Sequence, residues 1–342
     1  MINRLVWMET DNTYPYRNLA MEEYMTLHVP RGTCILYLWQ NRHTVVIGKN
    51  QNCWRECRVN FLEQEDGYLV RRLSGGGAVF HDLGNLNFTF IVGAGDYDVS
   101  GQLDVILEAV RSLGIHAEKT GRNDITVDGR KFSGNAFYRT GDGCYHHGTI
   151  LIRADKENMS RYLNVSKEKL ASKGVTSVKS RVANLCEFKP DITLEEVKSA
   201  LVEAFSKVYG QPAVRMEEGE LPQPDIDART EKFASWQWKY GRKIPFEYEM
   251  EKRFPWGNIQ IQFHVDEGMI QDVNVFSDAM DQEMIGMLAE QLKGCAYAEE
   301  DICRAVKAVG TDAFQAGEYT GADEPQSCRI KEDIMTLVRE SL

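Results

Sequence analysis

The feature that most constrains this chain is the run Arg71-Arg72-Leu73-Ser74-Gly75-Gly76-Gly77-Ala78-Val79-Phe80-His81-Asp82. The residues around it predict a strand before the glycines (68–72) and a second strand after them (87–92). Three consecutive glycines carry no Cβ, so the backbone can adopt positive φ and approach a ligand closely. Free N–H groups in such a turn form an anion site. The alternative is a glycine-rich hairpin loop that binds nothing, but the paired arginines, Ser74 and His81-Asp82 favour a site.

This run differs from the two common phosphate-binding loops. It contains no Gly-x-x-x-x-Gly-Lys-Ser/Thr, and the residues after the glycines predict a strand. A P-loop or a Rossmann turn must instead open a helix. The sequence therefore predicts an anion site of another kind.

Length and charge limit the classes of function. A chain of 342 residues favours two domains. A net charge of −11 disfavours a protein that binds nucleic-acid backbones, so the arginine pair suits one small anionic ligand better. Acidic residues soon interrupt the N-terminal apolar run, which predicts no signal peptide, and no apolar stretch is long enough to cross a membrane.

The eight cysteines show neither a disulfide framework nor a zinc pattern. Cys53-x-x-x-Cys57 is one residue too loose for a zinc knuckle and has no second pair nearby. We expect reduced thiols in a cytosolic protein.

The second informative stretch is residues 121–134. Asp128-Gly129 between two alternating runs is a strong hairpin signal. Strand alternation then predicts Lys131 and Ser133 on one face, with Arg130 and Phe132 on the other. Phe132 would point to the core, whereas Lys131 would face either solvent or a polar cavity.

Other segments are predicted from periodicity and composition. Helices are expected over 16–28, 101–113 and 193–208, and strands over 34–39 and 44–47 are expected to form a hairpin. Residues 211–230 contain three prolines and predict a long surface excursion. His146 and His147 lie in a predicted strand and point to opposite faces, so one should be structural and the other near a pocket. The residues of segment 173–185 are mostly small, polar or basic, which predicts a loop.

From about residue 252 the pattern starts again. Strands over 258–265 and 269–276 flank a Glu267-Gly268 turn, and helices follow over 283–292, over 301–309 and near the C-terminus. This predicts a small α+β unit without catalytic residues.

The motif Arg-Arg-x-Ser-Gly-Gly-Gly-Ala-Val-Phe-His-Asp-x-Gly-Asn-x-Asn-Phe resembles the signature of the lipoate-protein ligase A family, whose catalytic domain is similar to biotin-protein ligase. Gly-Arg-Asn-Asp, a hairpin and Lys-x-Ser-Gly are similar to the segment in which this family presents its catalytic lysine. The resemblance implies an α+β fold with a large catalytic domain of mixed and antiparallel sheets flanked by helices (1–245). A small α+β accessory domain would follow (252–342).

The resemblance also implies the activity. ATP, with Mg²⁺, would activate free lipoate to lipoyl-AMP, and the acyl group would pass to a lysine of a lipoyl acceptor domain, such as a 2-oxoacid dehydrogenase E2 subunit or the glycine cleavage H protein. The enzyme would be a cytoplasmic ligase of lipoate salvage that binds neither nucleic acid nor membrane.

Site residues carry over by position in the matched motifs. Lys131 would be catalytic. The resemblance places ATP and the adenylate at Arg72, Gly77, Ala78, Val79, Phe80, Asn123, Asp124 and Lys131, with Asp124 also able to hold Mg²⁺. It places lipoate at Ser74, Gly75, Gly76, Lys131 and His147, and an adenylate-covering loop at Gly174, Val175, Thr176, Ser177, Val178 and Arg181.

Two alternatives stay open. One is an acyltransferase of the same fold that moves octanoyl or lipoyl groups between carrier proteins through a cysteine thioester. Its cysteine would precede the lysine hairpin, where this chain has Gly121-Arg122-Asn123-Asp124, although Cys144 is nearby in sequence. The other is a non-catalytic protein that binds lipoate or a nucleotide, which an intact Lys131 and glycine run disfavour.

Overall fold

The computed structural model describes the chain except for residues 121–123, 165–180 and 311–325. Its contacts divide the chain into two compact units. Unit 1 comprises 1–47, 53–72 and 78–239, and unit 2 comprises 48–52, 73–77 and 240–342. Two short segments of the first hundred residues therefore pack with the C-terminal strands, which the sequence pattern did not indicate.

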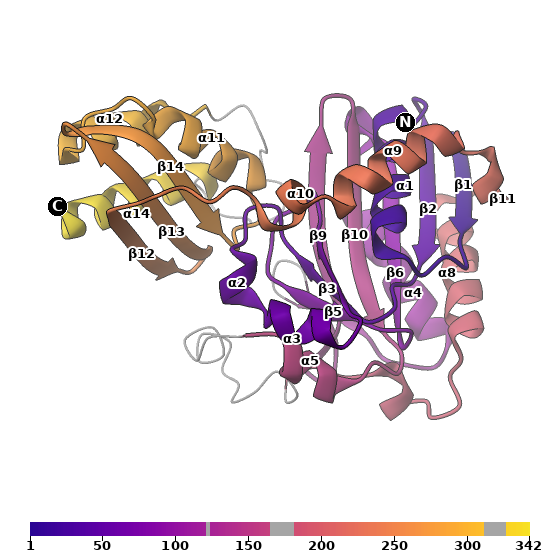
Figure 1. Ribbon diagram of the computed structural model, residues 1–342. Helices are drawn as coiled ribbons and strands as arrows, with labels where there is room; N and C mark the ends of the chain where they lie inside the picture. Colours follow the sequence, from indigo (N-terminus) through magenta and orange to yellow (C-terminus); the bar gives the residue numbers. More distant parts are fainter. Residues whose placement is uncertain (121–123, 165–180, 311–325) are drawn as a thin grey trace. The chain divides into compact units, whose positions relative to one another are not determined.

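A mixed eight-stranded sheet forms the centre of unit 1 (Figure 1). In spatial order its strands are β11 (Ala213–Arg215), β1 (Arg4–Glu9), β2 (Thr33–Trp39), β6 (Asn85–Gly93), β10 (Gly143–Leu151), β9 (Arg130–Thr140), β8 (Asp124–Val127) and β7 (Glu118–Thr120). β11, β1 and β2 run parallel, while the pairs from β2 to β7 are antiparallel. β2 is buried along its whole length because elements cover the sheet on both faces.

A second, three-stranded sheet in unit 1 has the order β4 (Tyr68–Arg71), β3 (Thr44–Ile47) and β5 (Val79–His81). The strands before and after the glycine run thus both pair with β3 and not with each other. The expected hairpin of 34–39 with 44–47 is wrong, because β2 and β3 belong to different sheets.

The helices of unit 1 are α1 (Pro15–His28), α2 (Cys53–Glu56), α3 (Val59–Gln64), α4 (Val99–Ser112), α5 (Lys156–Tyr162), α8 (Leu194–Tyr209) and α9 (Gln223–Ala234), with α10 (Trp236–Tyr240) at its end and short 3-10 turns at Ala94–Asp96, Leu185–Glu187 and Glu218–Glu220. The predicted helices over 16–28, 101–113 and 193–208 are confirmed. Thr193 caps α8 in a capping box with Glu196, and Gly210 ends it in the left-handed conformation. The expected excursion at 211–230 is wrong in part, because this segment forms β11 and most of α9.

The two faces of the large sheet differ in chemistry. Leu36, Phe88 and Phe90 project from one face into an apolar core shared with α4 and α8. On the other face, Thr89 and His147 are paired in register and both contact Glu22 of α1. One face is thus a hydrophobic core, and the other carries buried polar groups.

Unit 2 is built around the sheet β12 (Tyr248–Phe254), β13 (Gly257–Asp266) and β14 (Met269–Ser277), with α11 (Gln282–Leu292), α12 (Glu299–Ala308) and α14 (Gln326–Ser341). Ile259, Ile261 and Phe263 of β13 share an apolar core with these helices. Glu267 and Gly268 both have positive φ, as a two-residue hairpin turn requires. The predicted small α+β unit is confirmed.

The Asp128-Gly129 turn between β8 and β9 gives a test of local backbone strain. Gly129 has φ +71° with open space around its Cβ position, so Gly129→Ala would change only the backbone preference. We expect this variant to lower the free energy of local opening of the hairpin by about 1 kcal/mol. Hydrogen exchange of the β8 and β9 amides measures this free energy of local opening.

Gly219→Ala is the matched control, because Gly219 also has open space around it but no positive φ. It should leave the exchange rates of the hairpin unchanged. Equal effects of the two variants would contradict the assignment of strain to Gly129.

Candidate active site

The β8–β9 hairpin brings Lys131 to the polar face of the large sheet. Asp128 and Gly129 have φ of 49° and 71°, which is the two-residue turn predicted from the sequence. The strands pair Val127 with Arg130 directly across this turn. The position of Lys131 next to a tight turn is therefore confirmed.

A β-bulge follows immediately and decides which way Lys131 points. Thr126 pairs with Lys131 and Ile125 pairs with Ser133, so Phe132 is an extra residue in β9. Beyond the bulge, Asp124 pairs with Gly134. Residues opposite each other in a sheet share a face, and alternate residues of one strand do so too. Lys131, Gly134 and Asp124 therefore lie on the same face.

This register corrects one expectation from the sequence. Strict alternation predicted Lys131 and Ser133 on one face, but their partners Thr126 and Ile125 are consecutive residues and face opposite sides. The extra residue at Phe132 shifts the alternation by one. Phe132 itself is fully buried in the apolar core, as expected.

Lys131 is held by a carboxylate. Its Nζ lies 2.5 Å from Oδ1 of Asp124, and the other oxygen of Asp124 accepts a hydrogen bond from Arg181 at 3.0 Å. Burial alone would raise the pKa of Asp124, but the two cations hold this pKa below its usual value. Lys131, Arg181 and Asp124 thus form a cluster that carries two positive charges and one negative charge at neutral pH.

Gly134 provides the space for the Lys131 side chain. A Cβ at position 134 would lie 2.5 Å from Nζ of Lys131 and 2.6 Å from its Cε. The backbone N–H of Gly134 donates to Oγ1 of Thr149 on β10 at 3.3 Å. The Lys-x-Ser-Gly motif therefore has a steric reason, because the lysine folds back over the glycine.

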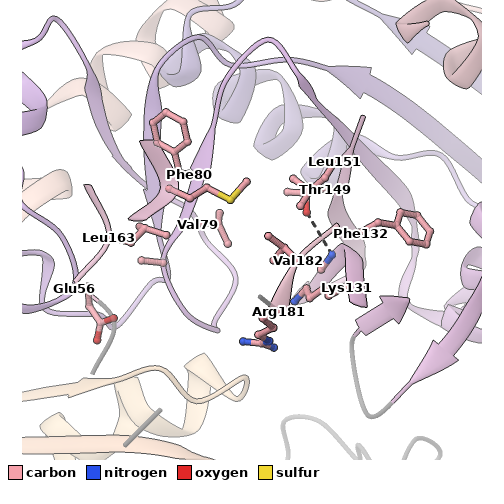
Figure 2. A pocket seen from close by; sticks show the side chains of 13 residues that line it. Glu56, Val79, Phe80, Lys131, Phe132, Thr149, Leu151, Leu163, Arg181 and Val182 are labelled. Carbon is pink, nitrogen blue, oxygen red and sulfur yellow. Dashed lines mark hydrogen bonds between the residues drawn. The ribbon is translucent and has the colours of Figure 1, made fainter. Parts of the chain in front are cut away.

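A cavity of about 130 Å³ opens beside this cluster (Figure 2). Figure 2 shows Lys131 and Arg181 on one side, Val79, Phe80 and Leu163 on the other, and the Phe132 ring pointing away. The full lining is Glu56, Ala78, Val79, Phe80, Lys131, Phe132, Gly134, Thr149, Leu151, Met159, Leu163, Arg181 and Val182. The cavity is apolar on one wall and cationic on the other.

The segment that carries Arg181 is tied to β9 next to Lys131. Val182 forms a parallel bridge with Lys131, and the N–H of Ala183 donates to the carbonyl of Lys131 at 2.9 Å. The Asn184 side chain both accepts from and donates to the backbone of Ala154, at 3.0 and 2.9 Å. These bonds fix the end of the segment that lines the cavity.

Glu187 also holds the segment that carries Arg181. It accepts hydrogen bonds from Lys156 at 2.5 Å, from the backbone of Asn184 at 2.7 Å and from Arg130 at 2.7 Å. Burial acts to raise its pKa, but the Asn184 N–H and the two cations lower the pKa of Glu187 to about 2. The Glu187 carboxylate therefore stays ionised across the physiological pH range. Sequence reasoning missed both Asn184 and Glu187.

The expected site residues fall into three groups. Ala78, Val79, Phe80, Lys131 and Arg181 line the cavity, and Asp124 contacts it through Lys131 and Arg181. The residues that do not line it are Arg72, Ser74, Gly75, Gly76, Gly77 and His147. Asn123, Gly174, Val175, Thr176, Ser177 and Val178 lie outside the described residues.

The glycine run packs against its own chain. The N–H of Gly76, which has φ +86°, donates to the carbonyl of Ala279 at 3.0 Å. A Cβ on Gly75 would lie 2.4 Å from the same oxygen and 2.6 Å from the carbonyl oxygen of Met280. Gly75 and Gly76 thus use their missing side chains for close backbone contact within unit 2.

The two adjacent arginines are both buried but differ in their surroundings. Arg71 donates to the backbone carbonyls of Trp238 and Lys239, which suits a structural role. Arg72 donates to the carbonyl of Val46 at 3.3 Å. Burial lowers the pKa of Arg72 to about 10, against the opposing effects of Tyr145 and Glu22, so Arg72 stays cationic at neutral pH.

The two histidines lie on opposite faces of the sheet, as expected, but His147 does not line the cavity. His146 is fully buried on the core face, where its ring nitrogens contact Gln102 and Asn135. His147 lies on the polar face, with Nδ1 2.9 Å from Oε1 of Glu22. Glu22 is 1% exposed, and sequence reasoning missed this buried carboxylate.

No cysteine forms a disulfide, and burial raises the pKa of several thiols, which makes them poor nucleophiles. Cys144 is fully buried, and burial raises the pKa of its thiol to about 11. Cys53 and Cys57 also have raised pKa values because they are buried. A thiolate would be scarce at each of these positions.

Comparison with known proteins identifies the family. Residues 14–206 match the model of the lipoyl protein ligase A/B catalytic domain, and residues 243–321 match that of the bacterial lipoate protein ligase C-terminus. A curated lipoate-protein ligase A of Psychrobacter cryohalolentis is 41% identical over 298 residues, which are 85% of this chain and 88% of that protein. The chain belongs to the lipoate-protein ligase A family.

Solved structures confirm the fold. P. falciparum LipL1 in complex with lipoate is 28% identical, with a TM-score of 0.81 over 97% of this chain and 99% of that one. A protein from the structural analysis of a bi-partite lipoate protein ligase and its E2 lipoyl domain of Thermoplasma acidophilum is 26% identical, with a TM-score of 0.61 over 71% of this chain and 99% of that one. The predicted fold class, the family and the ligase activity are confirmed.

Two further findings concern the described part of the chain. No three of its His, Cys, Asp or Glu side chains are grouped as a metal site would require. None of its helices is long and apolar enough to span a bilayer.

The space above Gly134 provides a test of the lysine's position. Gly134→Ala would place a methyl group on the Lys131 side chain, whose far end can move without unfolding the sheet. We expect ligase activity to fall about a hundredfold, as a displacement near 1 Å can cause. The thermal unfolding temperature should change little.

Gly93→Ala on β6 serves as the control, because its Cβ would make only an ordinary contact at 3.7 Å. It should retain activity. Full activity of Gly134→Ala would contradict the role assigned to the folded-back lysine.

Proposed function

We propose that this chain activates lipoate with ATP and transfers the lipoyl group to a lysine of a lipoyl domain. In the first step a carboxylate oxygen of lipoate attacks the α-phosphorus of ATP, and the bond to the β-phosphate oxygen breaks to release pyrophosphate. In the second step the acceptor amine attacks the acyl carbon, loses a proton, and AMP leaves with the electron pair. The observation that carries the proposal is the Lys131 ammonium held at the cavity by Asp124.

Both steps build negative charge on oxygen atoms, so prearranged cations lower both barriers. Lys131 would bridge the lipoate carboxylate and the α-phosphate, and later polarise the acyl carbonyl. Arg181, on the same carboxylate, would contribute a second positive charge. At ~4 Å and an effective dielectric constant near 20, one such contact is worth about 4 kcal/mol.

The apolar wall of the cavity suits the adenosine part of the nucleotide. Phe80, Met159 and Leu163 can pack against a base, while Ala78 and Val79 lead from the glycine run toward it. We assign Arg72 and the segment 77–80 to ATP, as the family motif implies. Asn123 and the segment 174–178 belong to this proposal as nucleotide-binding and adenylate-covering residues.

The proposal includes Mg²⁺ bound together with ATP. This ion is usually held by one or two carboxylates plus substrate phosphates. Asp124 is one such carboxylate, and Glu56 also lines the cavity. The ion would neutralise phosphate charge.

The polar face beyond the cavity is assigned to the acyl chain. His147 lies two residues from the cavity residue Thr149 on β10, so their side chains share a face. Ser74, Gly75 and Gly76 would contribute from the glycine run. The lipoate bound by the P. falciparum relative supports lipoate as the acyl substrate.

The acceptor and the setting complete the proposal. The Thermoplasma relative is described together with its E2 lipoyl domain, which supports E2 lipoyl domains as acceptors, and we extend this assignment to the H protein. Catalysis is assigned to 1–245 and an accessory role to 252–342, consistent with the two matched family regions. Eight free cysteines suit a cytoplasmic enzyme of lipoate salvage.

Removal of the central cation tests the mechanism. Lys131→Ala should fold, because Arg181 still balances Asp124, and should lower the overall rate about a thousandfold, the equivalent of ~4 kcal/mol. Intact mass of a purified lipoyl domain incubated with ATP, Mg²⁺ and lipoate measures the rate.

Lys119→Ala is the matched control, since Lys119 pairs with Asp104 on the surface, away from the cavity. Its rate should equal that of the wild type. Normal turnover by folded Lys131→Ala would remove this lysine from the mechanism.

The thioester alternative makes an opposite prediction about nucleotide and thiol. An adenylating enzyme exchanges labelled pyrophosphate into ATP when lipoate is present, and it needs no cysteine. Because Cys144 is buried and its thiol has a raised pKa, Cys144→Ser should retain both exchange and transfer. Loss of transfer in this variant, or no exchange by the wild type, would favour the transferase.

A further inference from the structure

His81 on β5 is a buried histidine with one ring nitrogen unused. It is 4% exposed, and its Nδ1 lies 3.3 Å from Nδ2 of Asn41. Its Nε2 is also buried and has no hydrogen-bond partner among the residues that the structure describes. Buried polar atoms are nearly always paired in folded proteins, so an orphan of this kind points to a ligand atom.

The orientation of a neighbouring amide is fixed by the backbone. Nδ2 of Asn18 lies 2.8 Å from the carbonyl oxygen of Gln40 and 3.1 Å from that of Asn12. Carbonyl oxygens only accept hydrogen bonds, so the atom of Asn18 that faces them must be its nitrogen.

The orientation of Asn18 determines that of Asn41, and the orientation of Asn41 determines which His81 nitrogen carries the proton. The same nitrogen of Asn18 lies 3.0 Å from the Asn41 side chain, so the Asn41 atom facing it is the oxygen. The nitrogen of Asn41 therefore faces His81 and donates to Nδ1. Nδ1 of His81 must be the unprotonated nitrogen.

The ring is neutral at physiological pH. Burial, together with the charges of Arg72 and His147, lowers the pKa of His81 to about 3. A neutral imidazole whose Nδ1 accepts carries its one proton on Nε2. The orphan nitrogen is thus an N–H donor.

The surroundings of this donor belong to the polar face of the large sheet. The His81 ring lies 6.5 Å from the Trp39 ring, and Nε1 of Trp39 donates to Oγ1 of Thr89. Thr89 in turn contacts the Glu22 carboxylate that also holds His147. His81 therefore lies over the face that the proposed function assigns to the acyl chain.

We propose that Asn18 and Asn41 are positioning residues that hold the His81 proton on Nε2, and that this N–H binds an acceptor atom of the acyl substrate. The second part rests on the proposed function. Lipoate offers two kinds of acceptor, a carboxylate oxygen and a ring sulfur, and the kinetic experiment distinguishes them.

The tautomer is measured without any activity assay. In protein labelled with ¹⁵N-histidine, long-range proton–nitrogen correlation should show His81 protonated on Nε2 alone. Asn41→Asp should move the proton to Nδ1, because a carboxylate only accepts hydrogen bonds. Asn85→Asp, another buried asparagine whose Nδ2 donates to Asn87, is the control and should leave the tautomer unchanged. Protonation of wild-type His81 on Nδ1 would contradict the positioning role proposed for Asn18 and Asn41.

Kinetics test the contact with substrate. The amide of glutamine can present a nitrogen where histidine has Nε2, whereas phenylalanine cannot, so His81→Gln and His81→Phe form a matched pair. In lipoate-dependent pyrophosphate exchange, KM for lipoate should rise about tenfold in His81→Phe and Asn41→Asp, the size of one lost hydrogen bond. His81→Gln should stay near the wild type, and KM for ATP should be unchanged in all variants.

Octanoate, which lacks the ring sulfurs, identifies the acceptor. An equal loss with octanoate and lipoate assigns the carboxylate, and a loss with lipoate alone assigns a sulfur. Unchanged KM for lipoate in folded His81→Phe would overturn the substrate contact even if the tautomer is as expected. Absence of lipoate-dependent pyrophosphate exchange in the wild type would instead contradict the proposed function. The tautomer measurement would still test whether Asn18 and Asn41 hold the His81 proton on Nε2.

Discussion

The one extra residue at Phe132 is the constraint on which the rest of the site depends. It lets Phe132 enter the apolar core while Lys131 and Gly134, three positions apart, both face the polar side of the sheet. Without it, Lys131 would face the side opposite to Asp124. The turn before the bulge, the glycine after it and the anchored segment 181–184 all serve to hold one ammonium at one place.

The site is organised by charge as much as by shape. Asp124 balances Lys131 and Arg181, so two cations can stand beside a partly apolar cavity at a moderate electrostatic cost. Under the proposed function, an entering carboxylate or phosphate would meet cations that are already oriented, which is the arrangement that stabilises charge in a transition state. Asn184 and Glu187 keep Arg181 in position from outside the cavity.

Buried polar groups extend from this cluster across the same sheet face. Glu22, Thr89 and His147 form one set of hydrogen bonds, and Asn18, Asn41 and His81 form another. Such groups are costly to bury unless they are paired, and the hydrogen bonds within each set offset that cost. The opposite face, packed with phenylalanine and leucine against α4 and α8, provides the stability of the unit.

The sequence by itself determined the elements with strong local signals. The apolar stripes of 101–113 and 193–208 and the Asp128-Gly129 turn form as their residues predict, and the motifs indicated the family. The hairpin of β2 with β3 was predicted wrongly, and the surface excursion at 211–230 was wrong in part, because strand partners and proline-bounded helices depend on contacts distant in sequence. Only the tertiary structure decided that Phe132 bulges, that Gly75 packs on Ala279, and that His81 presents a buried N–H. A bulge, a close backbone contact and a tautomer are each set by atoms that the local sequence does not contain.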